Sequence, residues 1–179
     1  MTKKTERLVT CSLSVALATV LSMVRLFRFP FGGSVTLCCM LFVYLPAWLY
    51  GIRTGLLCGL LYGLTQFVTG PYFMSVPQFL FDYVFAFTVM GLGGYFANAA
   101  SGLEKGYIVA VLGRWIMAGI AGLIWVSLGS EVWDGWAPLP YSLCYNGCYI
   151  FAEALITLIV LRIPAVRKAL LMVKERSRS

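Results

Sequence analysis

The sequence predicts an all-α integral membrane protein, a single domain over 1–179 that bundles six transmembrane helices with both termini in the cytoplasm. Composition is the first reason: 60% of the 179 residues are hydrophobic and only 12% are charged. A soluble domain carries about 25% charged residues, so most of this surface must face lipid. The apolar residues also fall into long runs, and the basic residues gather on one side of those runs.

A helix needs about 20 mainly apolar residues to cross a bilayer. The stretches that qualify are 8–27, 36–52, 54–70, 76–97, 106–128 and 141–163. The first follows a basic start and lacks a cleavage site, so we interpret it as a retained span and not a signal peptide. The second and third are short and are joined by a tight turn at 51–54. Pro46 lies inside the second span, where we expect a kink or an early end.

The basic residues determine the orientation. With an even number of spans both termini share a side, and that side holds eleven basic residues: Lys3, Lys4, Arg7, Arg53, Lys105, Arg162, Arg167, Lys168, Lys174, Arg176 and Arg178. The other side holds at most Arg25 and Arg28, so the positive-inside rule places both termini in the cytoplasm. The net charge of +7 therefore reflects membrane topology, and we expect no nucleic-acid partner.

The basic tail at 164–179 has two interpretations. It is either a short amphipathic helix lying at the inner membrane surface or ordinary topology charge.

The sequence indicates no metal, cofactor or nucleotide site. It has no His and no CxxC pair, and we expect its cysteines to be small buried apolar residues: Cys11, Cys38, Cys39, Cys58, Cys144 and Cys148. Phosphate-loop and dinucleotide motifs are absent, so a transporter built from this chain needs a gradient or a partner for energy.

Charged residues within a membrane span require a partner or a function. Arg114 lies roughly 12 Å above the inner edge and Glu153 roughly 18 Å below the outer edge, at 1.5 Å per residue. In a hydrocarbon core of about 30 Å these depths coincide. We therefore predict an ion pair between Arg114 and Glu153 that joins the fifth and sixth helices; the alternative is a proton or ion relay.

Asp82 lies in the outer half of the fourth span, roughly 9 Å below the surface. Gln78 is one helical turn above it, Tyr83 is adjacent, and Asn146 of the sixth span lies at the same depth. Aromatic residues lie above this layer: Trp133, Trp136, Tyr141 and Tyr145. A carboxylate, amides and aromatic faces suit a flat organic cation.

Two alternatives remain for this layer. Aromatic residues also form belts at membrane interfaces. Asp82 could instead pair with Arg25 or Arg28 near the outer end of the first span.

Small residues at four-residue spacing predict close helix contacts. The third span carries Gly55, Gly59 and Gly63 in this pattern. The first span carries two related sets, Ser14, Ala18 and Ser22, flanked by Ser12 and Ala16. Such stripes serve packing within one bundle or docking to another membrane subunit.

Several segments resemble one family over residues 8–163. They are GGSVTL at 32–37, YGIRTG at 50–55, QFLFDY at 78–83, AF at 86–87, GLGG at 91–94 and YSLCYNG at 141–147. Together they resemble the thiamine-specific S components of energy-coupling factor (ECF) transporters. That resemblance implies a non-enzymatic, six-helix, substrate-binding subunit in a bacterial plasma membrane.

The resemblance also implies partners. A protein of this family captures thiamine or a related small organic cation from outside the cell with high affinity. It associates with a coupling transmembrane subunit and two cytoplasmic ATPases. Its first helix docks to the coupling subunit through small residues, which here are Ser12, Ser14, Ala16, Ala18 and Ser22.

Position by position, the resemblance implies that Asp82 faces the thiazolium ring and that Tyr141 and Asn146 lie near the pyrimidine. Tyr83, Trp133 and Trp136 match further aromatic positions. One departure stands out, because Ala118 occupies the place of a family His. The missing hydrogen bond could cost about 1–3 kcal/mol, so a thiamine precursor, a related pyrimidine or another vitamin is an alternative ligand.

Functions of other classes remain alternatives. An autonomous secondary carrier could couple protons through the Arg114 and Glu153 layer. A membrane enzyme is disfavoured, because Asp82 and Glu153 lie at different depths and no His is available as an acid or base.

Overall fold

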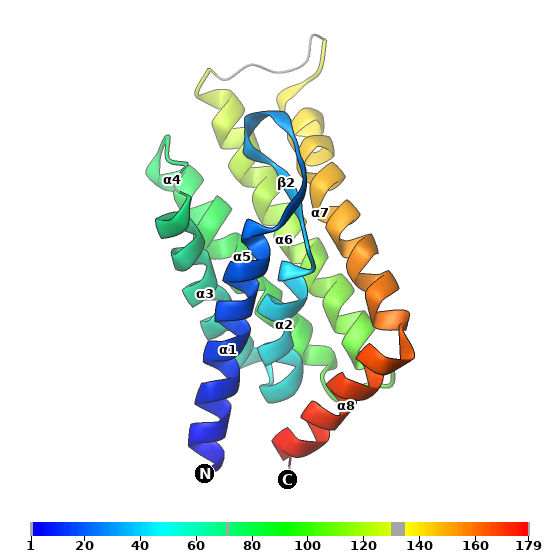
Figure 1. Cartoon of the computed structure of the whole chain (residues 1–179). Helices are drawn as coiled ribbons and strands as arrows, with labels where there is room; N and C mark the ends of the chain where they lie inside the picture. The colour runs from blue at the N-terminus through cyan, green and yellow to red at the C-terminus, as the bar shows by residue number, and fades with distance from the viewer. Residues whose placement is uncertain (1, 71, 130–134, 179) are drawn as a thin grey trace.

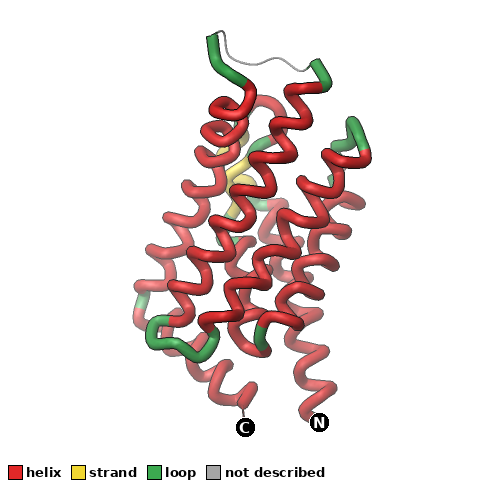
Figure 2. The backbone as a smooth tube through the Cα atoms, turned by 180° about the vertical axis from the view of Figure 1, so that it is seen from behind, coloured by secondary structure: helices red, strands yellow, loops and turns green. Residues whose placement is uncertain are grey.

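The structure is a computed structural model that describes residues 2–70, 72–129 and 135–178. Long helices lie side by side in a bundle, and both termini lie at the same end of it (Figure 1). A two-stranded hairpin lies toward the opposite end, as the view from behind also shows (Figure 2).

The elements follow one another without long loops in the described chain. The first half contains α1 (Lys3–Met23), β1 (Arg25–Arg28), η1 (Pro30–Gly32), β2 (Ser34–Thr36), α2 (Cys39–Tyr50) and α3 (Ile52–Thr69). A segmented helix follows: α4 (Val76–Phe79), η2 (Leu80–Phe85), α5 (Ala86–Thr88) and η3 (Val89–Phe96). The last elements are α6 (Gly102–Ser127), α7 (Pro138–Arg162) and α8 (Pro164–Arg178).

Within the described residues, four helices are long and apolar enough to cross a membrane. They are Lys3–Met23, Val76–Phe96, Gly102–Ser127 and Pro138–Arg162. The apolar helix α2 has only 12 residues. Large aliphatic side chains such as Leu57, Leu155 and Ile159 point away from the bundle, as a lipid-facing surface requires. The prediction of a helical membrane protein is confirmed.

The first predicted span, 8–27, is wrong at its carboxyl end. The helix stops at Met23, and β1 pairs antiparallel with β2, with Arg25 opposite Thr36 and Arg28 opposite Ser34. Pro30 lacks a backbone donor, and Gly32 takes a φ of +99° that suits glycine, so the chain turns back here. A run of apolar residues alone does not distinguish this hairpin from one more helical turn.

The second span begins later than predicted, because Cys38 has a left-handed backbone and α2 starts only at Cys39. The expected early end at Pro46 is wrong, since the helix continues to Tyr50. The residues of α2 form the centre of the core, with Met40, Tyr44 and Ala47 fully buried.

Glycines let α3 approach its neighbours closely. A Cβ on Gly59 would lie 2.2 Å from the carbonyl oxygen of Phe87, and one on Gly63 would lie 2.1 Å from that of Tyr83. Helix α3 therefore packs against the backbone of α5 and η2, as the spacing predicted.

The two small-residue sets of α1 have different surroundings. Ser14 and Ala18 are buried inside the bundle, and Ser22 accepts a hydrogen bond from Gln66 Nε2 at 2.7 Å. Ser12 and Ala16 lie on the exposed side of the helix. Only the second set is open to another protein.

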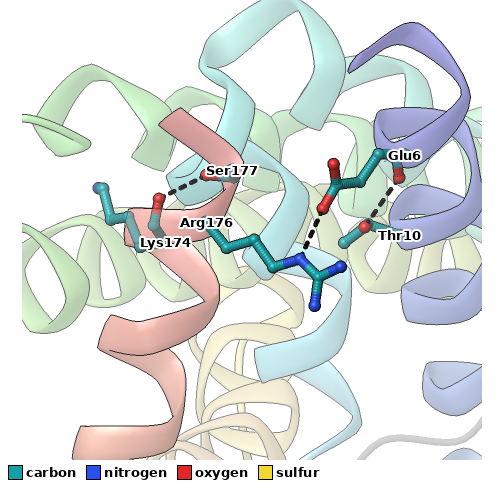
Figure 3. A network of polar contacts seen from close by, with 5 residues as sticks. All are labelled: Glu6, Thr10, Lys174, Arg176 and Ser177. Atoms are coloured by element: carbon teal, nitrogen blue, oxygen red, sulfur yellow. Dashed lines mark hydrogen bonds and ion pairs between the residues drawn. The ribbon is translucent and has the colours of Figure 1, made fainter. Parts of the chain in front are cut away.

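Helix α8 confirms that the tail is helical and packs across the end that carries the termini. Lys174 is buried: its Nζ lies 4.1 Å from the centre of the Trp48 ring and donates to the carbonyl oxygen of Trp48 at 3.1 Å and to that of Ala97. Arg176 Nε lies 3.1 Å from Glu6 Oε1, which links α8 to α1 (Figure 3).

The cysteine prediction is correct only in part. Cys38, Cys39 and Cys58 are buried and Cys11 is half-buried. Cys144 and Cys148 are exposed, because they share the side of α7 that faces away from the bundle.

Candidate functional site

A cavity of about 270 Å³ is lined in part by the hairpin and therefore lies in the half of the bundle that contains it. Its walls come from the hairpin, the end of α1, the end of α3, the segmented helix, α6 and α7. The volume lies just below the usual range of about 300–1,000 Å³ for ligand pockets. Polar groups and aromatic rings both contribute to its lining.

Asp82 contributes a carboxylate to this cavity from η2, a π-helical segment. Gln78 Nε2 donates to Asp82 Oδ2 at 3.1 Å, and Gln78 is itself only 2% exposed. The other oxygen of Asp82 accepts no hydrogen bond from the described residues. The alternative pair with Arg25 or Arg28 is not formed within the described chain, because Asp82 has no ion pair there. A carboxylate that is held by one amide and has no ion pair in the described chain can receive a cation.

Tyrosines of α7 form one wall of the cavity. Tyr141 and Tyr145 stack with ring centroids 6.0 Å apart, and the Tyr149 ring meets that of Tyr145 edge-on at 5.9 Å. The three residues recur every four positions, so one face of the helix carries all of them.

A second aromatic group lines the cavity near α4 and α6. Tyr83 accepts a hydrogen bond from the backbone N–H of Tyr72 at 3.0 Å and lies 3.3 Å from the carbonyl oxygen of Gly70. Trp125 Nε1 donates to the hydroxyl of Tyr72 at 2.5 Å. These bonds fix the aromatic faces that a flat ligand would contact.

The hairpin is held against this wall by α7. The Tyr145 hydroxyl accepts a hydrogen bond from the Gly33 N–H at 2.9 Å and donates one to the carbonyl oxygen of Pro30. The ring of Phe29 packs against Tyr145 and Tyr149. The cavity is therefore covered by a segment whose position depends on α7.

Asn146 is a buried cavity residue that also joins α6 to α7. Its Nδ2 donates to the carbonyl oxygens of Ser142 at 2.9 Å and Ala118 at 3.2 Å. Its Oδ1 accepts from the Tyr149 hydroxyl at 2.5 Å. Ala118 thus contributes its backbone carbonyl to this network and a methyl group to the cavity wall.

The predicted ion pair between Arg114 and Glu153 is not present as a direct contact. In the described chain the ion pairs within 4.0 Å are Arg167 with Glu104 and Arg176 with Glu6. Glu153 instead accepts from the Thr36 hydroxyl at 2.5 Å and from the Met40 N–H at 2.9 Å.

The pair fails because equal depth does not bring two side chains together. The β2 strand and the first turn of α2 occupy the space beside Glu153 and supply neutral donors to it. The Arg114 guanidinium lies 4.6 Å from the centre of the Phe87 ring and lines the same cavity as Asp82.

The cavity brings together five of the predicted ligand residues: Gln78, Asp82, Tyr83, Tyr141 and Asn146. Trp136 is 43% exposed and is not among the lining residues, and Trp133 lies outside the described residues. Sequence reasoning missed Tyr149, Trp125 and Arg114 as cavity residues. Two signals in the sequence could have revealed them. The tyrosines of α7 recur every four residues, and Trp125 lies three helical turns after Arg114 on α6.

These features define a class of protein. A helical membrane protein with a small, aromatic-lined cavity that contains the Asp82 carboxylate is suited to bind a small molecule within the membrane.

Residues 8–173 match the family described as thiamine transporter protein (Thia_YuaJ), and the chain belongs to that family. It is therefore a transport protein and not an enzyme. It is 31% identical over 176 residues to the thiamine transporter ThiT of Bacillus subtilis (strain 168), with 89% of this chain and 90% of the relative covered.

A solved structure has the same fold. ThiT from Listeria monocytogenes superposes with a TM-score of 0.73 at 23% identity, covering 92% of this chain and 97% of the other.

Proposed function

We propose that this chain is the high-affinity thiamine-binding S component of an ECF-type ABC transporter. The main support for this proposal is that the Asp82 carboxylate lies in a tyrosine-lined cavity, in a chain that belongs to the thiamine transporter family. Thiamine combines a cationic thiazolium ring with a flat pyrimidine ring. A counter-ion between aromatic faces recognises that combination.

Each cavity residue has a proposed role. Asp82 is the counter-ion for the thiazolium ring, and Gln78 holds its carboxylate in place. Tyr83 and Tyr141 provide aromatic contact, and Asn146 fixes the wall beside the pyrimidine. Trp133 and Trp136 complete the aromatic surface as thiamine enters.

The proposed topology has six membrane crossings in a bacterial plasma membrane, with both termini in the cytoplasm. Helices α2 and α3 provide the two crossings beyond the four long apolar helices. The shared position of both termini supports an even number of crossings (Figure 1). The eleven basic residues on that side support its cytoplasmic location.

The proposed partners are a coupling transmembrane subunit and two ATPases. Transport needs an energy source, and the sequence has no nucleotide-binding motif of its own. We place the docking surface on α1 at Ser12 and Ala16, since the side chains of Ser14, Ala18 and Ser22 already pack within the bundle.

The test is a titration of the purified full-length protein with thiamine, followed by tryptophan fluorescence. Trp125 lines the cavity, so we expect strong quenching at submicromolar thiamine. The variant Asp82→Asn should bind at least about tenfold more weakly, because a desolvated charge contact is lost. Unchanged affinity in Asp82→Asn would show that the carboxylate is structural.

A matched control is Glu104→Gln, which removes another partly buried carboxylate, at the end of the bundle that carries the termini. It should bind thiamine as the wild type does. If thiamine does not quench the fluorescence of the wild type but a thiamine precursor or another vitamin does, the proposed ligand is wrong and the proposed binding role stands.

A further inference from the structure

We infer that Arg114 is a specificity-determining residue of the cavity and that its guanidinium donates to a hydrogen-bond acceptor on the ligand. This inference rests on the proposed function and deepens it. It assigns two points of recognition to one cavity, Asp82 for the cationic ring and Arg114 for an acceptor elsewhere on the same molecule.

The first observation is an unused set of donors. A guanidinium carries five N–H groups, and Arg114 makes no hydrogen bond with any residue of the described chain. Its Nη1 is fully buried and has no partner there. A buried donor without an acceptor is costly, most of all when it is charged. The natural sequence keeps this cost, which a bound acceptor would remove.

The second observation is that neither neighbouring acid forms an ion pair or a hydrogen bond with Arg114 in the described chain. Both oxygens of Glu153 accept hydrogen bonds, from Thr36 and from the Met40 N–H. One oxygen of Asp82 accepts from Gln78. The Arg114 guanidinium therefore lies over the face of the Phe87 ring, 4.6 Å from the ring centroid, without an ion pair in the described chain. Such an arrangement fixes the guanidinium without using its donors.

The third observation is the space beside Arg114. Ala118, Ala121 and Gly122 follow it on α6, and all four residues line the cavity. Ala118 is one helical turn from Arg114, so a methyl group lies where a larger side chain would block the ligand. A ligand in the cavity can thus reach the guanidinium.

Charge fixes the orientation of that ligand. A cationic ring is attracted to Asp82 and repelled by Arg114, so the end that approaches Arg114 must be uncharged or anionic and must accept hydrogen bonds. Thiamine has two such groups, the pyrimidine ring nitrogens and the hydroxyl oxygen of its side chain. The ligand class is therefore a flat organic cation with an acceptor remote from its charge.

The experiment is a double-mutant cycle between Arg114 and the ligand, measured by calorimetry on the purified full-length protein. The ligands are thiamine, an analogue with an ethyl group in place of the hydroxyethyl group, and an analogue with CH in place of a pyrimidine nitrogen. The variants are Arg114→Met, which removes every donor, and Arg114→Lys, which keeps the charge.

We expect Arg114→Met to bind thiamine roughly 10- to 100-fold more weakly, the loss for a buried charged donor. One of the two analogues should show a similar loss with the wild type and little further loss with Arg114→Met. Arg114→Lys should recover part of the affinity. If Arg114→Met does not fold, the same coupling is measured with Arg114→Lys.

The matched control is Lys174→Met, which removes another buried cation that lies over an aromatic ring, far from the cavity. It should leave thiamine affinity unchanged. If the wild type binds thiamine but the losses from changing the ligand and from changing Arg114 simply add, the proposed role of Arg114 is wrong and the proposed function still stands. Absence of wild-type thiamine binding would overturn the proposed function and this inference with it.

Discussion

At the scale of single residues, Glu153 shows what sequence position can and cannot determine. Its burial in the membrane was predictable from an acidic residue in an apolar run. Its partners were not, because the Thr36 hydroxyl and the Met40 N–H belong to a hairpin strand and a helix start that the apolar pattern does not reveal. Asp82 and Gln78 were predictable as neighbours, because helical spacing places them on one face of the same helix. Asn146 was expected at their depth, but its place in the same cavity depends on how α7 packs in the bundle.

Exchanging the charges at Arg114 and Glu153 should not restore stability lost by either single change. An arginine at 153 cannot accept the hydrogen bonds that the carboxylate accepts from Thr36 and Met40. We expect Arg114→Glu with Glu153→Arg to melt no higher than Glu153→Arg alone, measured by thermal unfolding in detergent.

A conservative control separates charge from hydrogen bonding. Glu153→Gln keeps one acceptor oxygen and should be less destabilised than Glu153→Leu, which leaves two buried donors unsatisfied at about 1–3 kcal/mol each. Rescue by the charge exchange would show that a direct ion pair forms in the membrane after all.

At the scale of elements, the glycines of α3 were predicted as a contact surface, but their partner was not. The sequence reveals spacing and residue size, while the choice of α5 and η2 as neighbours depends on the whole bundle. The hairpin at 25–36 was missed for a related reason: its strands are too short to show a reliable alternation.

Gly59→Ala should destabilise the bundle, because the added Cβ would lie 2.2 Å from the Phe87 carbonyl oxygen, a backbone atom that cannot move alone. Overpacking of this kind costs about 1–3 kcal/mol. We expect a lower melting temperature and a weaker thiamine response, since Phe87 also lines the cavity.

The control on the same helix is Leu61→Ala, whose side chain points away from the bundle. It should melt close to the wild type. Equal stability of Gly59→Ala and Leu61→Ala would mean that α3 and α5 are not packed through this glycine.

At the scale of the whole molecule, membrane residence follows from composition, because 12% charged residues cannot cover a water-facing surface. The cavity does not follow from composition. It depends on which face of each helix turns inward, and α1 illustrates this: two sets of small residues look equivalent in the sequence, yet only Ser14, Ala18 and Ser22 face the bundle.

Ala16→Trp should leave thiamine binding intact and strongly reduce uptake into cells that contain the coupling subunit and the ATPases. The exposed side of α1 would be too bulky to dock, while the cavity is unaffected. Binding is measured by fluorescence on purified protein and uptake with labelled thiamine.

Ala169→Trp on the exposed side of α8 is the control for bulk and should transport normally. Normal uptake by Ala16→Trp would contradict docking through this face. Uptake that persists without the ATPases would instead indicate an autonomous carrier.

The π-helical segment Leu80–Phe85 has a wider effect than the position of one carboxylate. A wide turn rotates everything after it relative to an uninterrupted α-helix. Asp82 inside the turn and Gly91 beyond it, which touches the α3 backbone, are therefore set by the same irregularity. Deleting one residue here would shift the Asp82 carboxylate and the Gly91 contact with α3 together, so ligand binding and helix packing would be lost at once.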